Sequence, residues 1–141
     1  ILCILYVIYL EYQPIPNSIK VIEPTPTPYI ITEDKLLSVV QDWKYKEDGY
    51  TYSISEDLCK LTQLRLDETA TEWNHNGFYK YRGWYGFTYL GENLALDYYN
   101  EEDMLNAWLK SASHAANLNA DYQYTCIKCK ENRCVQIFGN Y

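Results

Sequence analysis

The sequence has few basic residues, few histidines and no long apolar run. Its 141 residues include 12 lysines and arginines against 19 aspartates and glutamates, and the formal net charge is −7. Because proteins that follow nucleic-acid phosphates present a basic surface, we expect no nucleic-acid partner. No glycine-rich phosphate-binding loop occurs. The apolar run from Ile1 to Leu10 is about half of the roughly 20 residues that span a bilayer.

Proline is absent after Pro28, and this absence divides the chain. All five prolines lie between Pro14 and Pro28. We expect residues 13–31 to form a semi-rigid, proline-rich linker that extends about 3.1 Å per residue. Residues 32–141 have the size of one domain, and the composition, with 48% hydrophobic residues, is sufficient to build a core. The 16 tyrosines suit a protein whose surfaces are partly apolar and partly wet.

Residues 1–12 are predicted to be the end of a signal anchor or of a signal peptide that begins upstream. A cleaved signal peptide needs small residues after its apolar core, whereas Glu11 and Tyr12 follow here. An uncleaved anchor to the cell surface is therefore favoured over a secreted form. A buried strand is the remaining alternative, because Ile, Val and Tyr are strand formers.

Capping residues and apolar periodicity predict helices that flank a small antiparallel sheet, which is an α+β sandwich. Trp73 and Trp108 lie on apolar helical faces and are expected in the core. The expected elements are helices over 33–46, from Ser55 to about His75, and after Asn100; a loop over 78–86; a short strand from 87 to 90 that runs into 91–95; a helical turn over 113–118; and strands over 122–130 and 133–139.

The cysteines predict two disulfides. Cys3 lies in the apolar segment, which leaves Cys59, Cys126, Cys129 and Cys134. A zinc knuckle is the alternative for the C-terminal three, but a structural zinc ion normally takes four ligands, and Cys59 lies far upstream. In an exported protein, disulfides are more common than a zinc site for such cysteines, so we expect disulfides here.

The predicted hairpin indicates which cysteines pair. A two-residue turn at 131–132 places Cys129 opposite Cys134, within disulfide reach. Cys126 then lies on the opposite face, where it can meet Cys59 on the second helix. We therefore predict the disulfides Cys129–Cys134 and Cys59–Cys126.

Five stretches follow one another in a recognisable order. They are Leu58–Arg65 (LCKLTQLR), Trp73–Phe78 (WNHNGF), Gly91–Ala95 (GENLA), Ala107–Leu118 (AWLKSASHAANL) and Cys134–Gly139 (CVQIFG). GENLA alone is a weak signal, but followed by W-x-x-S-x-x-H-x-x-N-L and VQ-x-FG it is specific. Over about residues 32–141 the sequence resembles the CAP superfamily (cysteine-rich secretory, antigen 5 and pathogenesis-related class 1 proteins), and most closely its bacterial extracellular, SCP-like members.

The resemblance implies a CAP-like α-β-α sandwich with a cleft lined by two histidines and two acidic residues. The positions that match the family motifs are His75, Glu92 and His114. The second glutamate of eukaryotic members corresponds to Ser111 here, as in many bacterial relatives. We therefore expect His75, Glu92, Ser111 and His114 to line the cleft, and a mechanism that needs a second carboxylate is in doubt.

Two functions remain open on these residues. The first is a secreted or surface-anchored binding module whose cleft takes a small apolar or cell-envelope ligand. The second is a metal-dependent, peptidase-like hydrolase in which His75 and His114, with Glu92, hold a zinc ion and leave an open water position. The missing second carboxylate favours binding over catalysis. Glu92 could instead only orient one imidazole.

Two further assignments stay open. Arg65 is either a buried partner of an acid or a surface residue. The aromatic residues Tyr79, Tyr81, Trp84 and Tyr85 lie in one loop, where they either line a ligand groove or pack beneath the loop.

Overall fold

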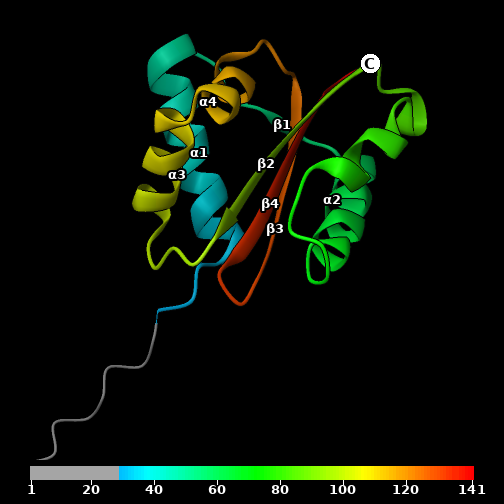
Figure 1. Cartoon of the computed structure of the whole chain (residues 1–141). Helices are drawn as coiled ribbons and strands as arrows, with labels where there is room; N and C mark the ends of the chain where they lie inside the picture. The colour runs from blue at the N-terminus through cyan, green and yellow to red at the C-terminus, as the bar shows by residue number, and fades with distance from the viewer. Residues whose placement is uncertain (1–28) are drawn as a thin grey trace, which may run out of the picture.

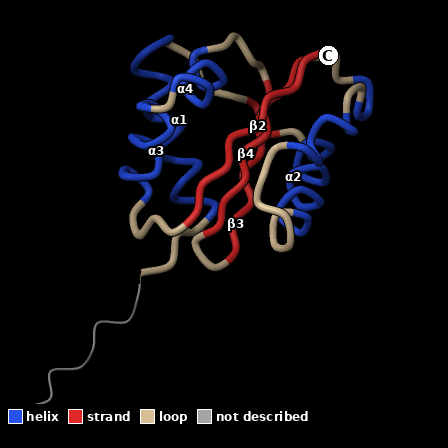
Figure 2. Tube along the Cα trace, in the orientation of Figure 1, coloured by secondary structure: helices blue, strands red, loops and turns tan. Residues whose placement is uncertain are grey.

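The structure, a computed structural model, describes residues 29–141 as three layers (Figure 1). Helices α1 (Glu33–Asp48), α3 (Glu101–Lys110) and α4 (Ala112–Asn119) cover one face of the sheet, and α2 (Glu56–Glu68) covers the other (Figure 2). The expected apolar segment at 1–12 and the linker up to residue 28 lie outside the described residues. Among those described, no helix combines the length and apolar character needed to cross a bilayer.

The sheet has four strands in the order β1-β3-β4-β2. Strands β2 (Tyr89–Leu96), β3 (Tyr124–Lys130) and β4 (Arg133–Asn140) are antiparallel. The three longer strands thus form the small antiparallel sheet that was expected, and the two-residue strand β1 (Ser53–Ile54), which was not, adds to β3 in parallel. Two residues are too few to show an alternating pattern in the sequence.

Helix α2 ends at Glu68, about seven residues before the position expected. Backbone turns from Asp67 and Glu68 close the helix end, and Arg65 Nη2 donates to the carbonyl of Asn74 at 2.8 Å, which ties the following segment to the last turns of the helix. Trp73 therefore lies outside the helix and is 39% exposed, which corrects its expected place in the core. The following segment, expected as a loop, forms two 3-10 turns, Asn76–Tyr81 and Trp84–Gly86.

The core has one apolar cluster on each face of the sheet. The cluster beneath α1, α3 and α4 is centred on Trp108, which is 1% exposed as expected from its helical stripe. The cluster beneath α2 includes Leu58, Leu61, Val135 and Ile137. Asn100 caps α3 by accepting from the backbone amide of Asp103.

The C-terminal hairpin and both disulfides are present. Cys129 faces Cys134 across the β3–β4 pair, and the two turn residues have φ of 52° and 57°, as in a type I′ turn. The disulfide Cys129–Cys134 closes this hairpin, and Cys59–Cys126 ties α2 to β3. Both pairs are those expected from the sequence.

Candidate functional site

A buried ion pair between α2 and β2 forms the base of the site. Glu92 lies on β2, and its side chain is 1% exposed. Arg65 on α2 contacts it with two nitrogens, from Nε to Oε2 at 2.6 Å and from Nη2 to Oε1 at 3.1 Å. A buried carboxylate is costly without a partner, and this two-pronged contact supplies Glu92 with a cation and two hydrogen bonds inside the protein. Arg65 is thereby settled as the buried partner of an acid.

His75 contacts the same carboxylate from the loop after α2. Its Nδ1 lies 2.9 Å from Glu92 Oε1. Since the carboxylate can only accept, Nδ1 carries the hydrogen and Nε2 is the nitrogen that faces other groups. The His75 side chain is 43% exposed, so Glu92 orients an imidazole that solvent and ligands can reach.

His114 reaches the site from α4, on the other face of the sheet. The two imidazole centroids are 5.9 Å apart and their planes are inclined by 55°. Burial, followed by the nearby charge of His75, lowers the pKa of His114. The pair is therefore held close, with His114 favoured in its neutral form.

Glu68 extends the network on the outer side of Arg65. It accepts from Arg65 Nη1 at 2.5 Å, from the Tyr81 hydroxyl at 2.6 Å and from Lys80. Burial raises the pKa of Glu68, but the hydrogen bonds from Lys80, Tyr81 and Arg65 outweigh it and lower the value to about 2. Gly77 packs directly on the Arg65 guanidinium, where a β-carbon would clash.

A cavity of about 280 Å³ opens over the two imidazoles. Asn117 fixes its α4 wall by donating to the Glu92 carbonyl at 3.1 Å and to Asn93 Oδ1 at 2.9 Å. Gly91 allows this approach, because a β-carbon there would lie 2.8 Å from Asn117 Oδ1. The cavity is lined by His75, Phe78, Tyr79, Leu90, Gly91, Glu92, Ser113, His114 and Asn117.

Ser111, expected in the cleft, is not among the lining residues. It occupies the junction between α3 and α4, where its carbonyl accepts from the backbone amide of Ala115. Ser113 lines the cavity in its place. The two serine hydroxyl oxygens are 3.4 Å apart, and within residues 29–141 neither hydroxyl is hydrogen-bonded to an imidazole.

The side chains present do not fit a catalytic zinc ion, which normally takes three protein ligands. Both oxygens of Glu92 already accept from Arg65, and one also accepts from His75. This leaves two imidazoles as candidate ligands. Within residues 29–141, no group of three or more His, Cys, Asp or Glu side chains is arranged to hold a metal ion.

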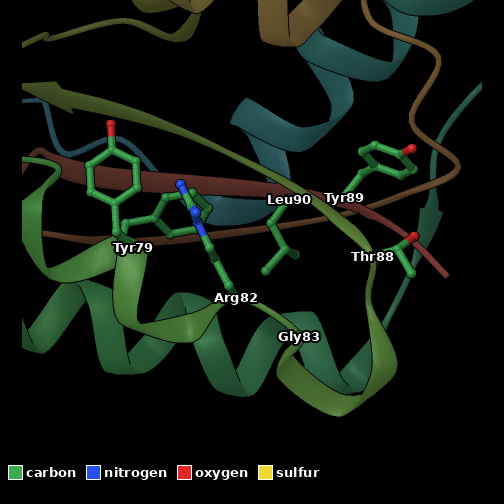
Figure 3. Close-up of a pocket in the computed structure, with 7 residues that line it drawn as sticks. Tyr79, Arg82, Gly83, Thr88, Tyr89 and Leu90 are labelled. Atoms are coloured by element: carbon green, nitrogen blue, oxygen red, sulfur yellow. The ribbon is translucent and has the colours of Figure 1, made fainter.

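A second groove, of about 360 Å³, adjoins the cavity (Figure 3). The two share Phe78, Tyr79 and Leu90. The aromatic loop divides here: Tyr81 and Trp84 pack against the cluster beneath α2, whereas Tyr79 is 59% exposed on the groove wall. Tyr81 and Trp84 thus pack beneath the loop, and Tyr79 lines a groove.

The residues that sequence reasoning missed belong mostly to stretches already singled out. Gly91 and Asn117 lie inside GENLA and the W-x-x-S-x-x-H-x-x-N-L motif, but their packing role needs the contact between α4 and β2. Phe78 closes the WNHNGF stretch. Tyr79 was among the aromatic loop residues with two open alternatives, whereas Leu90 carries no signal of its own, because its place in the cavity depends on how the loop folds.

Solved structures of bacterial proteins share this fold. A cysteine-rich secretory protein from Staphylococcus aureus matches with a TM-score of 0.64 and 14% identity over 78% of this chain. An extracellular protein containing an SCP domain, from Bacillus anthracis, matches with 0.63 and 18% over 77%. An outer surface protein from Borrelia burgdorferi matches with 0.64 and 22% over 81%.

The matches differ in how much of each relative they cover. This chain spans 40% and 41% of the staphylococcal and bacillar proteins and 98% of the borrelial one. No family model and no curated protein matches the sequence. The likeness establishes that residues 29–141 have the CAP, SCP-like fold expected from the sequence motifs.

Proposed function

We propose that this CAP-fold chain is a non-catalytic binding module, displayed outside a bacterial cell, whose cavity over His75 and His114 takes a small ligand. The observation that carries the proposal is the engagement of both carboxylate oxygens of Glu92 by neighbouring side chains. Both of its oxygens accept from Arg65, and one is also bonded to His75, so the carboxylate positions an imidazole and is less suited to bind a metal ion or to transfer a proton to a substrate.

The remaining groups suit recognition. His75 Nε2 and the half-buried His114 ring present nitrogen donors or acceptors at one side of the cavity, and Phe78 and Leu90 supply apolar wall. The lining thus combines apolar side chains with several fixed polar groups, and converging polar groups of this kind orient a ligand in small-molecule sites. A small apolar molecule or a cell-envelope fragment fits this chemistry.

An extracellular location is supported by two observations. The two disulfides would be unusual in a reducing compartment, and the structural relatives are described as secretory, extracellular or outer-surface proteins. The apolar segment at 1–12 would anchor the module, with residues 13–31 as its stalk. Sequencing the N-terminus of the mature protein tests the anchor: a start near Gln13 would show a cleaved, secreted form.

The cavity is tested with two probes, N-acetylglucosamine as a polar envelope fragment and decanoate as an apolar one. We expect at least one probe to shift the NMR signals of the His75 and His114 rings. Ser113→Tyr fills the cavity mouth from an exposed position and should abolish the shift. Ser38→Tyr, at an exposed position of α1, is the matched control and should leave the shift intact.

The proposal fails if neither probe moves the imidazole signals or if Ser113→Tyr responds like wild type. It also fails if the purified chain holds one equivalent of zinc and hydrolyses peptides in a zinc-dependent way. That result would establish the hydrolase alternative.

A further inference from the structure

The groove beside the cavity has the chemistry of a site for an acidic ligand. Its walls and floor come from the 3-10 turns and from the start of β2. Figure 3 shows the Arg82 side chain extending between Tyr79 and Leu90, with Tyr89 beyond Leu90. Gly83, with φ of 76°, turns the chain at the base of the groove. The site is thus held by a folded turn and a strand.

Arg82 is the cation of this groove, and its aromatic neighbour Tyr79 does not neutralise its charge. Within residues 29–141 its guanidinium forms no ion pair, and its nearest aromatic partner is the Tyr79 ring, 5.7 Å from the guanidinium carbon. The neighbouring Lys80, by contrast, is paired with Glu68. An arginine that is held over a ring and lacks a carboxylate partner can form two parallel hydrogen bonds to an incoming anion.

The local charge also favours an anion. The chain as a whole carries a net charge of −7, yet residues 78–91 (FYKYRGWYGFTYLG) contain one lysine, one arginine and no acid. No aspartate or glutamate lines the groove. An anionic group that enters it meets the guanidinium without a competing carboxylate beside it.

The walls favour a ring over an aliphatic chain. Tyr79 and Tyr89 are 59% and 69% exposed, so their rings offer wet, flat surfaces, and Thr88 adds a hydroxyl group nearby. A sugar ring can place its C–H face against a tyrosine while its hydroxyl groups stay hydrated. A fatty acyl chain gains most from an enclosed apolar tunnel, which this open groove does not provide.

We propose that the groove formed by Tyr79, Arg82 and Tyr89 binds an acidic saccharide, with a sugar carboxylate on the Arg82 guanidinium and sugar rings against the tyrosines. The inference rests on the proposed function, because the groove continues into the cavity through Phe78, Tyr79 and Leu90. It adds a ligand class: a carboxylate-bearing glycan of the cell envelope or of the surroundings.

The test is titration with a hyaluronan tetrasaccharide, which carries two carboxylates, and with the same tetrasaccharide after reduction of its carboxylates to alcohols. We expect the acidic form to shift the NMR signals of Arg82 Nε–H and the Gly83 amide, and the reduced form to bind at least about tenfold more weakly. Arg82→Gln should bind the acidic tetrasaccharide more weakly than wild type by the same factor. Arg82→Lys should recover only part of it, because an ammonium group lacks the planar fork.

Lys130→Gln is the matched control. Lys130 is an exposed cation at the hairpin, and its removal changes the net charge as much as Arg82→Gln does. It should leave tetrasaccharide binding unchanged, and thermal unfolding of both variants should match wild type because both side chains are exposed.

Three results would overturn the inference. The first is equal affinity for the acidic and the reduced tetrasaccharide, and the second is an equal loss of tetrasaccharide affinity in Arg82→Gln and Lys130→Gln. The third is a shift of the Arg82 NMR signal with decanoate but with neither saccharide. Each leaves the cavity intact as a binding site if the His75 and His114 signals still respond to their probes. Loss of those histidine responses instead contradicts the proposed function itself.

Discussion

The two faces of the sheet are stabilised in different ways. Beneath α1, α3 and α4, apolar side chains pack around Trp108, and the buried cation Lys44 is held close by, on carbonyl oxygens of Leu118 and Ala120. Beneath α2, an apolar cluster is combined with the buried Arg65–Glu92 pair, which links a helix to a strand 27 residues away. The first face also holds an ion pair, from Lys44 to the partly exposed Asp48, whereas both side chains of the Arg65–Glu92 pair on the second face are buried. The candidate site is built on the second.

Arg65→Met should show the largest effect on the α2 face. It leaves Glu92 buried without a partner, and breaking such a pair costs about 3–5 kcal/mol of unfolding free energy. It also frees the loop carbonyl of Asn74, so His75 should lose its fixed position. Urea denaturation measures the first effect, and loss of the His75–His114 proximity signal in NMR measures the second.

The double variant Arg65→Met/Glu92→Leu separates the charge from the packing. Replacing both members of a buried ion pair with apolar residues is often nearly neutral, so most of the stability should return. The orientation of His75 should not return, because its carboxylate partner is gone. If Arg65→Met alone were as stable as wild type, Glu92 would not be a buried charge that depends on Arg65.

Trp108→Ala is the corresponding change on the other face. It empties a buried aromatic site and should cost about 3–5 kcal/mol, with the added loss of the hydrogen bond from Nε1 to the Leu94 carbonyl. Because the damage lies across the sheet from Arg65, the two imidazoles should keep their contact under native conditions. A lowered denaturation midpoint together with unchanged probe binding would confirm that the two faces are stabilised separately. An unchanged midpoint would contradict the buried position of Trp108.

The difference between the faces also explains which parts could be predicted. Trp108, Met104 and Leu105 lie on one helical stripe, a local periodic signal, and their burial follows from it. The hairpin was equally local, because the turn fixed the register that sets Cys129 against Cys134. The motifs that carry the CAP resemblance placed His75, Glu92 and His114 in one site.

The parts that failed are those set by contacts distant in sequence. The early end of α2 accompanies the contact of Arg65 with Asn74, nine residues on, and the other partner of Arg65 is a glutamate on β2, 27 residues away. No spacing in the sequence indicates either contact. Strand β1 was missed because its order comes from pairing with β3, not from its two residues. Trp73 is not buried as expected because α2 ends before it reaches this residue.

The disulfides offer one crosslink on each face, and their removal should differ. Cys59 and Cys126 are 67 positions apart in the sequence, whereas Cys129 and Cys134 are 5 apart. On the chain-entropy model, replacing the first pair with alanine costs about 4 kcal/mol and the second about 2 kcal/mol. Denaturation of the two double-alanine variants checks the order, and equal losses would show that the short hairpin link does more than restrict the unfolded chain.

The smallest expected effect is a pH dependence of the unfolding free energy, caused by His114 where it meets His75. His114 lies on α4 but faces His75, and burial followed by that neighbouring charge lowers its pKa. As the pH falls through about 6.5, the unfolded chain takes up a proton at this residue before the folded chain does. The unfolding free energy should therefore decrease as the pH falls, until the folded imidazole is protonated as well.

His114→Gln should flatten this part of the stability profile, measured by urea denaturation between pH 7 and about pH 5. His75→Gln tests the second cause. Removing the neighbouring charge should weaken the dependence and leave the part due to burial, because the His114 ring remains packed on α4. If the profile of His114→Gln kept the wild-type slope, the two imidazoles would not be coupled, and the site would be a property of the α2 face alone.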